Sequence, residues 1–163
     1  MKISNEMVKA LNVQANMEFA SAYIYLSMSY DMENSGFPGF AHWLKVQYEE
    51  ERGHAFKLLS YISERDAKVE LAPIAGYDQH FTCPLETAKA VLAHEQLVTA
   101  ALENLFSQAR EEKDYAAELF LQWFITEQVE EEVNGRALIE KFSAAGTTPA
   151  ALHHVDRALN ARQ

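Results

Sequence analysis

Apolar residues recur at helical spacing along most of the chain, in segments that are separated by short clusters of turn-forming residues. Four of these segments are long and one is short. We expect helices over residues 4–32, 38–65, 84–112, 115–145 and 149–160. The pattern therefore predicts an all-α protein, a four-helix bundle with a short C-terminal fifth helix, in which residues 1–163 form a single domain.

Residues that begin or end helices mark the borders of these segments. The stretch from Asn34 to Pro38 ends the first helix, and Gly146 ends the fourth. Asp114 and Thr148 suit the N-caps of the fourth and fifth helices, because their side-chain oxygens can accept from unpaired backbone N–H groups. The helix borders are thus predicted independently of the apolar pattern.

The connections between the helices predict how the helices pair. Residues 66–82 contain Pro73 and Gly76, show no helical period and are too long for a tight hairpin. A segment of this length can cross from one end of the bundle to the other. Short connections make the first and second helices antiparallel, and likewise the third and fourth, whereas the long crossover makes the second and third helices parallel.

Charged residues interrupt the apolar stripe of each long helix. In the second helix, Glu51 and His54 lie three residues apart on the stripe. Glu18, Glu95 and Glu131 interrupt the stripes of the other three helices. The stripe expected for the fourth helix consists of Phe120, Phe124, Glu127, Glu131, Leu138 and Phe142. Because a lone buried carboxylate is destabilising by several kcal/mol, we expect a cation to compensate these acids.

The acidic positions fall at one height of the predicted bundle. Folding the first hairpin about its turn places Glu18 opposite the segment between Glu51 and His54. Folding the second hairpin places Glu95 opposite Glu131. Glu51 and Glu95 lie at distances from the starts of their parallel helices that differ by only ~3 Å, at about 1.5 Å per residue. All four helices therefore present an acid at the same level.

Carboxylates that face one another raise each other's pKa, and some would be protonated without a cation. A ligand set of several carboxylates and one imidazole suits iron or manganese better than a tetrahedral structural zinc. Two metal ions that share Glu51 as a bridge would use ligands from all four helices. The alternative is a purely structural bundle whose acids lie on solvated helix faces.

Composition limits the other function classes. The formal net charge of −10 argues against binding to nucleic acid and to an anionic membrane surface. No apolar run approaches membrane length. The single cysteine, Cys83, permits no intrachain disulfide, and residues 1–10 do not resemble a signal peptide. We therefore expect a cytoplasmic protein whose small partners are cations.

Four stretches of the sequence carry a more specific pattern. They are Asn16-Met17-Glu18 with Tyr25 downstream, Glu50-Glu51-Arg52-Gly53-His54, His94-Glu95-Gln96-Leu97, and Phe120-Leu121-Gln122-Trp123-Phe124 followed by Glu127-Gln128-Val129-Glu130-Glu131. With these stretches the chain resembles the bacterial non-haem ferritins over nearly its whole length. The resemblance implies an iron-storage protein that oxidises Fe(II) with dioxygen at a ferroxidase centre in each subunit. It also implies a hollow homo-oligomeric shell of twenty-four subunits that holds the ferric mineral.

The resemblance implies a role for each matching residue. The first iron would be held by Glu18, Glu51 and His54, and Glu51 would bridge to a second iron at Glu95 and Glu131. Gln128 would lie nearby, and Tyr25 would be a hydrogen-bond partner or an electron donor. A third, weaker iron site would use the acids Glu50, Glu127, Glu130 and Glu131. His153 and His154 would line a four-fold pore, with ordinary surface histidines as the alternative.

Departures from related families also restrict the function. Haem-containing relatives carry a second Glu-x-x-His on the fourth helix and a Met between the Glu and His of the second. Here Asn134 follows Glu131, and Arg52 stands at the position of that Met, so we expect no haem. The remaining alternative is a di-iron or manganese–iron carboxylate enzyme that acts on another substrate, which would need a substrate pocket beside the metals.

Two aromatic residues and one histidine have simpler interpretations. Trp123 and Phe124 are expected to pack in or near the core. His94 points about 100° away from Glu95 on an ideal helix, so it is not expected to be a ligand.

Overall fold

A computed structural model describes residues 3–162, which form five α-helices. The helices are α1 Asn5–Asn34, α2 Pro38–Glu64, α3 Pro84–Glu111, α4 Tyr115–Ala145 and α5 Pro149–Leu159. The predicted all-α fold is confirmed, and most predicted helix ends lie within a residue of the observed ones. α1 continues slightly beyond its predicted end, until Gly36 adopts a φ of +86° that glycine accommodates without steric cost.

Side-chain caps hold the starts of two long helices. Ser4 accepts a hydrogen bond from the backbone N–H of Met7 at the start of α1, and Asp114 accepts from Ala117 at the start of α4. Asp114 is also paired with both terminal nitrogens of Arg65, at 3.1 and 2.8 Å, which ties the end of α2 to the start of α4. Thr148 occupies the N-cap position of α5, but its side chain makes no capping hydrogen bond.

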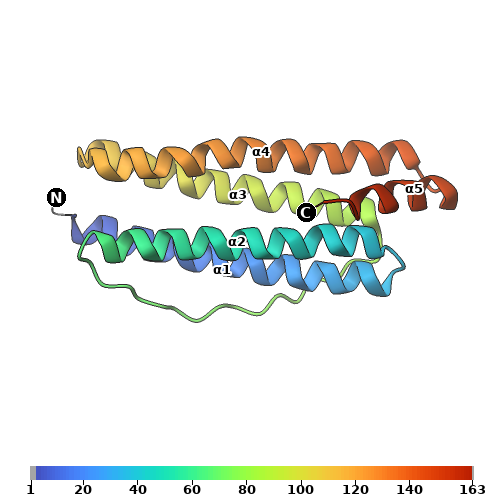
Figure 1. Ribbon diagram of the computed structural model, residues 1–163, viewed down its shortest axis with the longest axis horizontal. Coiled ribbons are helices and arrows are strands. Elements are labelled where there is room, and N and C mark those ends of the chain that lie inside the picture. The colour runs from blue at the N-terminus through green and yellow to red at the C-terminus, as the bar shows by residue number, and fades with distance from the viewer. Residues whose placement is uncertain (1–2, 163) are drawn as a thin grey trace.

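The helices pair as the connections predict. Figure 1 shows α1 and α2 as one antiparallel pair and α3 and α4 as another, with α5 across one end of the bundle. Residues 65–83, which contain no helix or strand, run along the length of the bundle and make α2 and α3 parallel (Figure 1). In the part of the chain that the structure describes, no helix has the length and apolar character to span a membrane.

Apolar side chains form two clusters, one towards each end of the bundle. One cluster includes Met7, Leu58, Leu102 and Phe124. The other includes Met28, Phe40, Leu44, Leu138 and Phe142. Burial of each such side chain stabilises the fold by about 1.5–3 kcal/mol. The two clusters fix the register of the four long helices, and the acidic level lies between them.

Candidate metal centre

The four acids that interrupt the stripes are all buried in the middle of the bundle. The exposed fraction is 1% for Glu18, 2% for Glu51, 1% for Glu95 and 6% for Glu131. Each comes from a different long helix, as predicted. Their apolar neighbours along each helix are buried as well, so the helices cannot rotate to expose the acids without exposing the core.

Glu18, Glu51 and His54 form the most compact group of ligand-type atoms. Each offers one such atom, and these atoms all lie within 4.8 Å of one another. Gln14 donates to Glu18 Oε1 at 2.7 Å, whereas Glu18 Oε2 is buried without a hydrogen-bond partner among the described residues. A buried carboxylate oxygen with no partner is costly, and a bound cation would satisfy it. The donor set of two carboxylates and one imidazole therefore fits a divalent metal ion.

Glu95 lies beside this group and is held by two side chains. The Tyr25 hydroxyl donates to Glu95 Oε1, and Gln128 Nε2 donates to Glu95 Oε2 at 3.1 Å. Burial, together with the charges of Glu95 and Glu51, raises the pKa of Tyr25 well above its usual value. The phenol therefore stays protonated and acts as a donor.

Gln47 connects Glu51 of the compact group with Glu131 of α4. This role of Gln47 was not predicted from the sequence. Its Nε2 donates to Glu51 Oε1 and to Glu131 Oε2, both at 2.9 Å. Gln47 precedes Glu51 by one helical turn, as Gln14 precedes Glu18. This repeated Gln–Glu spacing at i, i+4 is the sequence signal that could have identified both amides.

Burial and mutual repulsion set the protonation of the metal-free centre. Burial, followed by the charge of Glu51, raises the pKa of Glu18 well above its usual value and that of Glu95 to about 7. Burial and the charge of Glu95 raise the pKa of Glu131 to about 8.

Glu51 and His54 each shift the pKa of the other towards its charged form. Burial acts to raise the pKa of Glu51, but the hydrogen bond to His54 and the charge of His54 outweigh it and lower the pKa. Burial acts to lower the pKa of His54, but the bond to Glu51 and the nearby carboxylates raise it to about 9. Near neutral pH the metal-free centre therefore holds a Glu51–His54 ion pair and a protonated carboxyl at Glu131.

The acids expected in a third site lie further out. Glu127 is half-buried and Glu130 is exposed, while Glu50 is half-buried and paired with Arg162 at 2.5 Å. The placement of Glu127 on the buried stripe was wrong, because the buried line of α4 instead passes through Gln128. That line alternates steps of four and three residues along the whole helix, and this alternation turns Glu127 towards the side.

The surrounding aromatic and histidine residues differ in part from expectation. Phe124 is buried, but Trp123 is 36% exposed, and its ring packs edge-on against His54 with the centroids 5.4 Å apart. His94 hydrogen-bonds to Ser21 Oγ at 2.8 Å and lies outside the compact group. His153 and His154 are exposed on α5.

Comparisons with known proteins place the chain in one family. Residues 8–145 match the family described as "Ferritin-like domain". The chain is 38% identical over 160 residues to a bacterial non-heme ferritin of Bacteroides fragilis. The matched region covers 98% of this chain and 99% of that protein. The chain is 37% identical over 160 residues to a bacterial non-heme ferritin of Staphylococcus aureus, covering 98% and 96%.

Solved structures agree with this relationship. An open pore ferritin from the hyperthermophilic archaeon Archaeoglobus fulgidus superposes with a TM-score of 0.97 at 40% identity, covering 99% of this chain and 98% of that chain. An engineered closed form of the same archaeal ferritin gives a TM-score of 0.97 at 41% identity, covering 99% of both chains. The predicted helix order and crossover are therefore shared with these structures.

Proposed function

Because the chain belongs to the ferritin family, whose members store iron, we propose that it is an iron-storage protein with ferroxidase activity. It oxidises Fe(II) with dioxygen at a di-iron centre within each subunit. It deposits the ferric product as mineral inside a homo-oligomeric shell of twenty-four subunits. The observation that carries this proposal is the buried group of Glu18, Glu51 and His54, with an unpartnered oxygen on Glu18.

The ligands are divided between two iron ions that bind as substrate. Glu18, Glu51 and His54 hold the first ion. Glu51 also reaches the second, which Glu95 and Glu131 hold from α3 and α4. Iron binding displaces the proton that burial and repulsion keep on Glu131, because carboxylates must be deprotonated to coordinate.

The chain contributes geometry, and the two ferrous ions supply electrons to dioxygen, one from each ion. Tyr25 and Gln128 hold the carboxylate of Glu95, and Gln47 holds Glu51 and Glu131. Carboxylate ligands can change between bridging and terminal coordination, which suits a site that must also release its product. Tyr25, which lies against Glu95, is placed to supply an electron or to act only as a donor.

A third iron site at Glu50, Glu127, Glu130 and Glu131 would provide a route by which the product leaves the centre. Its support is the position of Glu131, which belongs to the centre and follows Glu130 directly on α4. In the metal-free protein Glu50 is held by Arg162 instead.

Iron loading tests the storage function directly. Ferrous iron is added aerobically to the full-length protein, and particle size and retained iron per subunit are then measured. We expect a large shell that retains many more iron ions than its centres can bind. A monomer or dimer that oxidises iron without retaining it would contradict storage and would favour an enzyme acting on another substrate.

A further inference from the structure

The C-terminal end of the chain is anchored on the first turns of α2. Asp156 of α5 is buried, and its carboxylate accepts hydrogen bonds from the N–H groups of Gly39 and Phe40, at 3.1 and 2.8 Å. These N–H groups lie in the first turn of α2, where the helix itself provides no acceptor. A Cβ at Gly39 would lie 1.8 Å from the backbone oxygen of Asp156, so α5 sits closer than any larger residue would permit.

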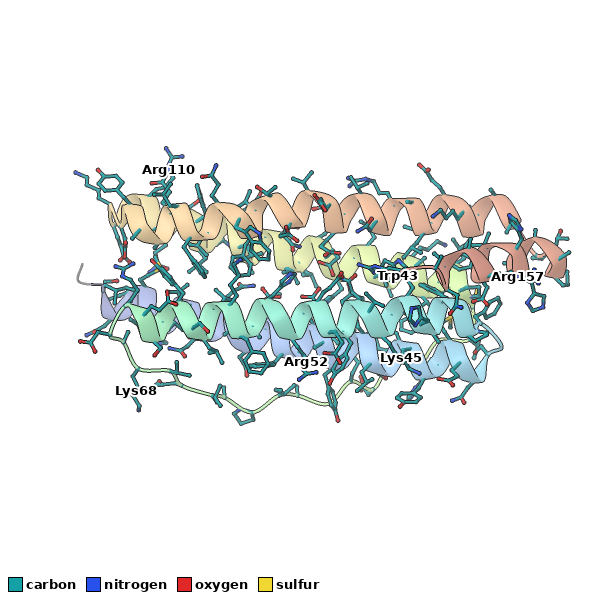
Figure 2. All side chains as sticks on the ribbon, viewed as in Figure 1. Trp43, Lys45, Arg52, Lys68, Arg110 and Arg157 are labelled. Atoms are coloured by element: carbon teal, nitrogen blue, oxygen red, sulfur yellow. The ribbon has the colours of Figure 1, made fainter. Side chains whose placement is uncertain are left out.

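Beyond α5, the chain continues along α2 towards the metal centre. His42 Nε2 donates to the backbone oxygen of Arg162 at 2.8 Å, and the guanidinium of Arg162 lies over the ring of Trp43, 4.3 Å from its centroid. Figure 1 shows α5 running back from the end of the bundle, and Figure 2 shows Trp43 on the side of α2 that α5 approaches. The last described residue is therefore held at a defined place.

The guanidinium of Arg162 reaches two polar side chains further along the same face of α2. It donates to Gln47 Oε1 at 2.9 Å and to Glu50 Oε2 at 2.5 Å. Arg162 is a donor only, so the oxygen of the Gln47 amide must face it, and the amide nitrogen then faces Glu51 and Glu131. Arg162 thus fixes which way the amide that joins the two halves of the centre is turned.

The charge of Arg162 also acts on the acids at this side of the centre. Burial raises the pKa of Glu50, and the positive charge of Arg162 opposes that increase. The same charge opposes the increase in the pKa of Glu131. The contact of Arg162 with Glu50 Oε2 shows that a cation is already present where Glu50 would bind a metal ion.

We propose that Arg162 is a tethered cation that occupies the Glu50 side of the metal centre and must be displaced before a further metal ion binds Glu50. The role rests on the proposed function, since it assumes metal ions at Glu18, Glu51 and His54. A metal ion bonded to Glu50 and the guanidinium would repel each other at this distance. Displacement of Arg162 also frees the Gln47 amide to rotate. A metal ion bound at Glu50 therefore weakens the hydrogen bonds from Gln47 to Glu51 and Glu131. Arg162 is in this sense a positioning residue.

The size of the effect follows from the exposure of the pair. The side chains of Arg162 and Glu50 are 19% and 39% exposed, so solvent screens their attraction. An ion pair of this kind changes the affinity of a competing cation by about two- to five-fold. High salt reduces the difference, because it screens an exposed pair further.

The test is a calorimetric titration of the full-length protein with Zn²⁺, which is redox-inert. Arg162→Gln should tighten the weakest class of Zn²⁺ sites by about two- to five-fold, and the difference should shrink at high salt. Arg162→Lys keeps the charge and should stay close to wild type. The matched control Arg157→Gln removes a charge from an exposed position of α5 and should leave all classes unchanged.

Two results would overturn the role of Arg162. One is an Arg162→Gln titration that matches wild type, and the other is equal tightening in Arg157→Gln, which would indicate a general charge effect. The variant Glu51→Ala separates this outcome from failure of the proposed function. Loss of the tight Zn²⁺ classes in Glu51→Ala, with no effect of Arg162→Gln, rejects only the tethered cation. Wild-type protein without any Zn²⁺ class that depends on Glu51 rejects the metal centre, and with it the role of Arg162.

Discussion

The Nδ1 atom of His54 lies 3.2 Å from Oε2 of Glu51, one helical turn away and inside the core. In the metal-free protein these two groups form a buried ion pair, since each shifts the other's pKa towards its charged form. Glu51 and His54 also each offer one ligand atom to the compact group with Glu18. The pair therefore keeps the ligands together until a cation replaces the proton on His54.

The first prediction concerns the dependence of metal stabilisation on pH. The folded pKa is raised to about 7 for Glu95 and to about 8 for Glu131. A raised folded pKa adds stability that is fully present below the unfolded value of ~4.3 and is lost as pH rises through the folded value. His54, raised to about 9, behaves in the same sense. The metal-free protein should therefore lose stability between pH 5 and pH 8.

Metal binding reverses this loss, because the ligands bind as deprotonated groups. Thermal melts of metal-free and Zn²⁺-loaded protein should show a larger increase in Tm at pH 8 than at pH 5, by at least ~4 °C. Equal increases at the two pH values would show that the buried carboxyls do not exchange protons for metal.

The second prediction concerns Tyr25. Tyr25→Phe removes the hydroxyl that donates to Glu95 and keeps the shape of the ring, so the Glu95 carboxylate retains only the bond from Gln128. We expect the free energy of unfolding of the metal-free protein to fall by about 1–2 kcal/mol. Urea denaturation measures this. An unchanged free energy would mean that the hydroxyl does not hold Glu95 in solution.

The third prediction concerns Gln47, which orients two ligands without being one. Gln47→Leu removes the donor to Glu51 and Glu131. Metal affinity at the centre should fall by about 10- to 100-fold, as is usual when a group that orients a ligand is lost. Zn²⁺ titration measures the change, with Gln96→Leu on the exposed face of α3 as the matched control. Similar affinities in the two variants would exclude this role.

The fourth prediction concerns the docking of α5 on α2. Gly39→Ala places a methyl group against the backbone of Asp156, and we expect a loss of about 1–3 kcal/mol in the free energy of unfolding. Gly53→Ala in the same helix is the control, because no atom lies within 4 Å of its new Cβ and alanine favours the helix. Gly53→Ala should be neutral or stabilising. A stable Gly39→Ala variant would indicate that α5 moves freely over α2.

Much of the fold could be predicted from the sequence, because burial follows helical periodicity. The level shared by Glu18, Glu51, Glu95 and Glu131 followed from turn positions and helix lengths alone. The buried line of α4 did not follow from periodicity alone. The side chains of Glu127 and Gln128 point about 100° apart on α4, and packing against α3 selects Gln128 as the one that faces Glu95.

Residues that act through tertiary contacts could not be found in the same way. Arg162 lies more than one hundred positions from Gln47, and no local pattern links them. Its place depends on the close approach of α5 at Gly39, which the sequence gives no means to foresee. Gln47 itself carried only a weak signal, its spacing from Glu51.

The central claim is that Glu18 and His54 are ligands of the iron that is oxidised. It is tested most directly by stopped-flow absorbance after full-length protein is mixed with two Fe(II) per subunit in air. Glu18→Ala and His54→Ala should each slow the initial oxidation by at least about 100-fold, as expected when an oriented catalytic group is lost. Glu6→Ala, an exposed glutamate on α1, is the control and should oxidise iron at the wild-type rate. Wild-type rates in Glu18→Ala or His54→Ala, in shells that remain assembled, would contradict the assignment of the centre.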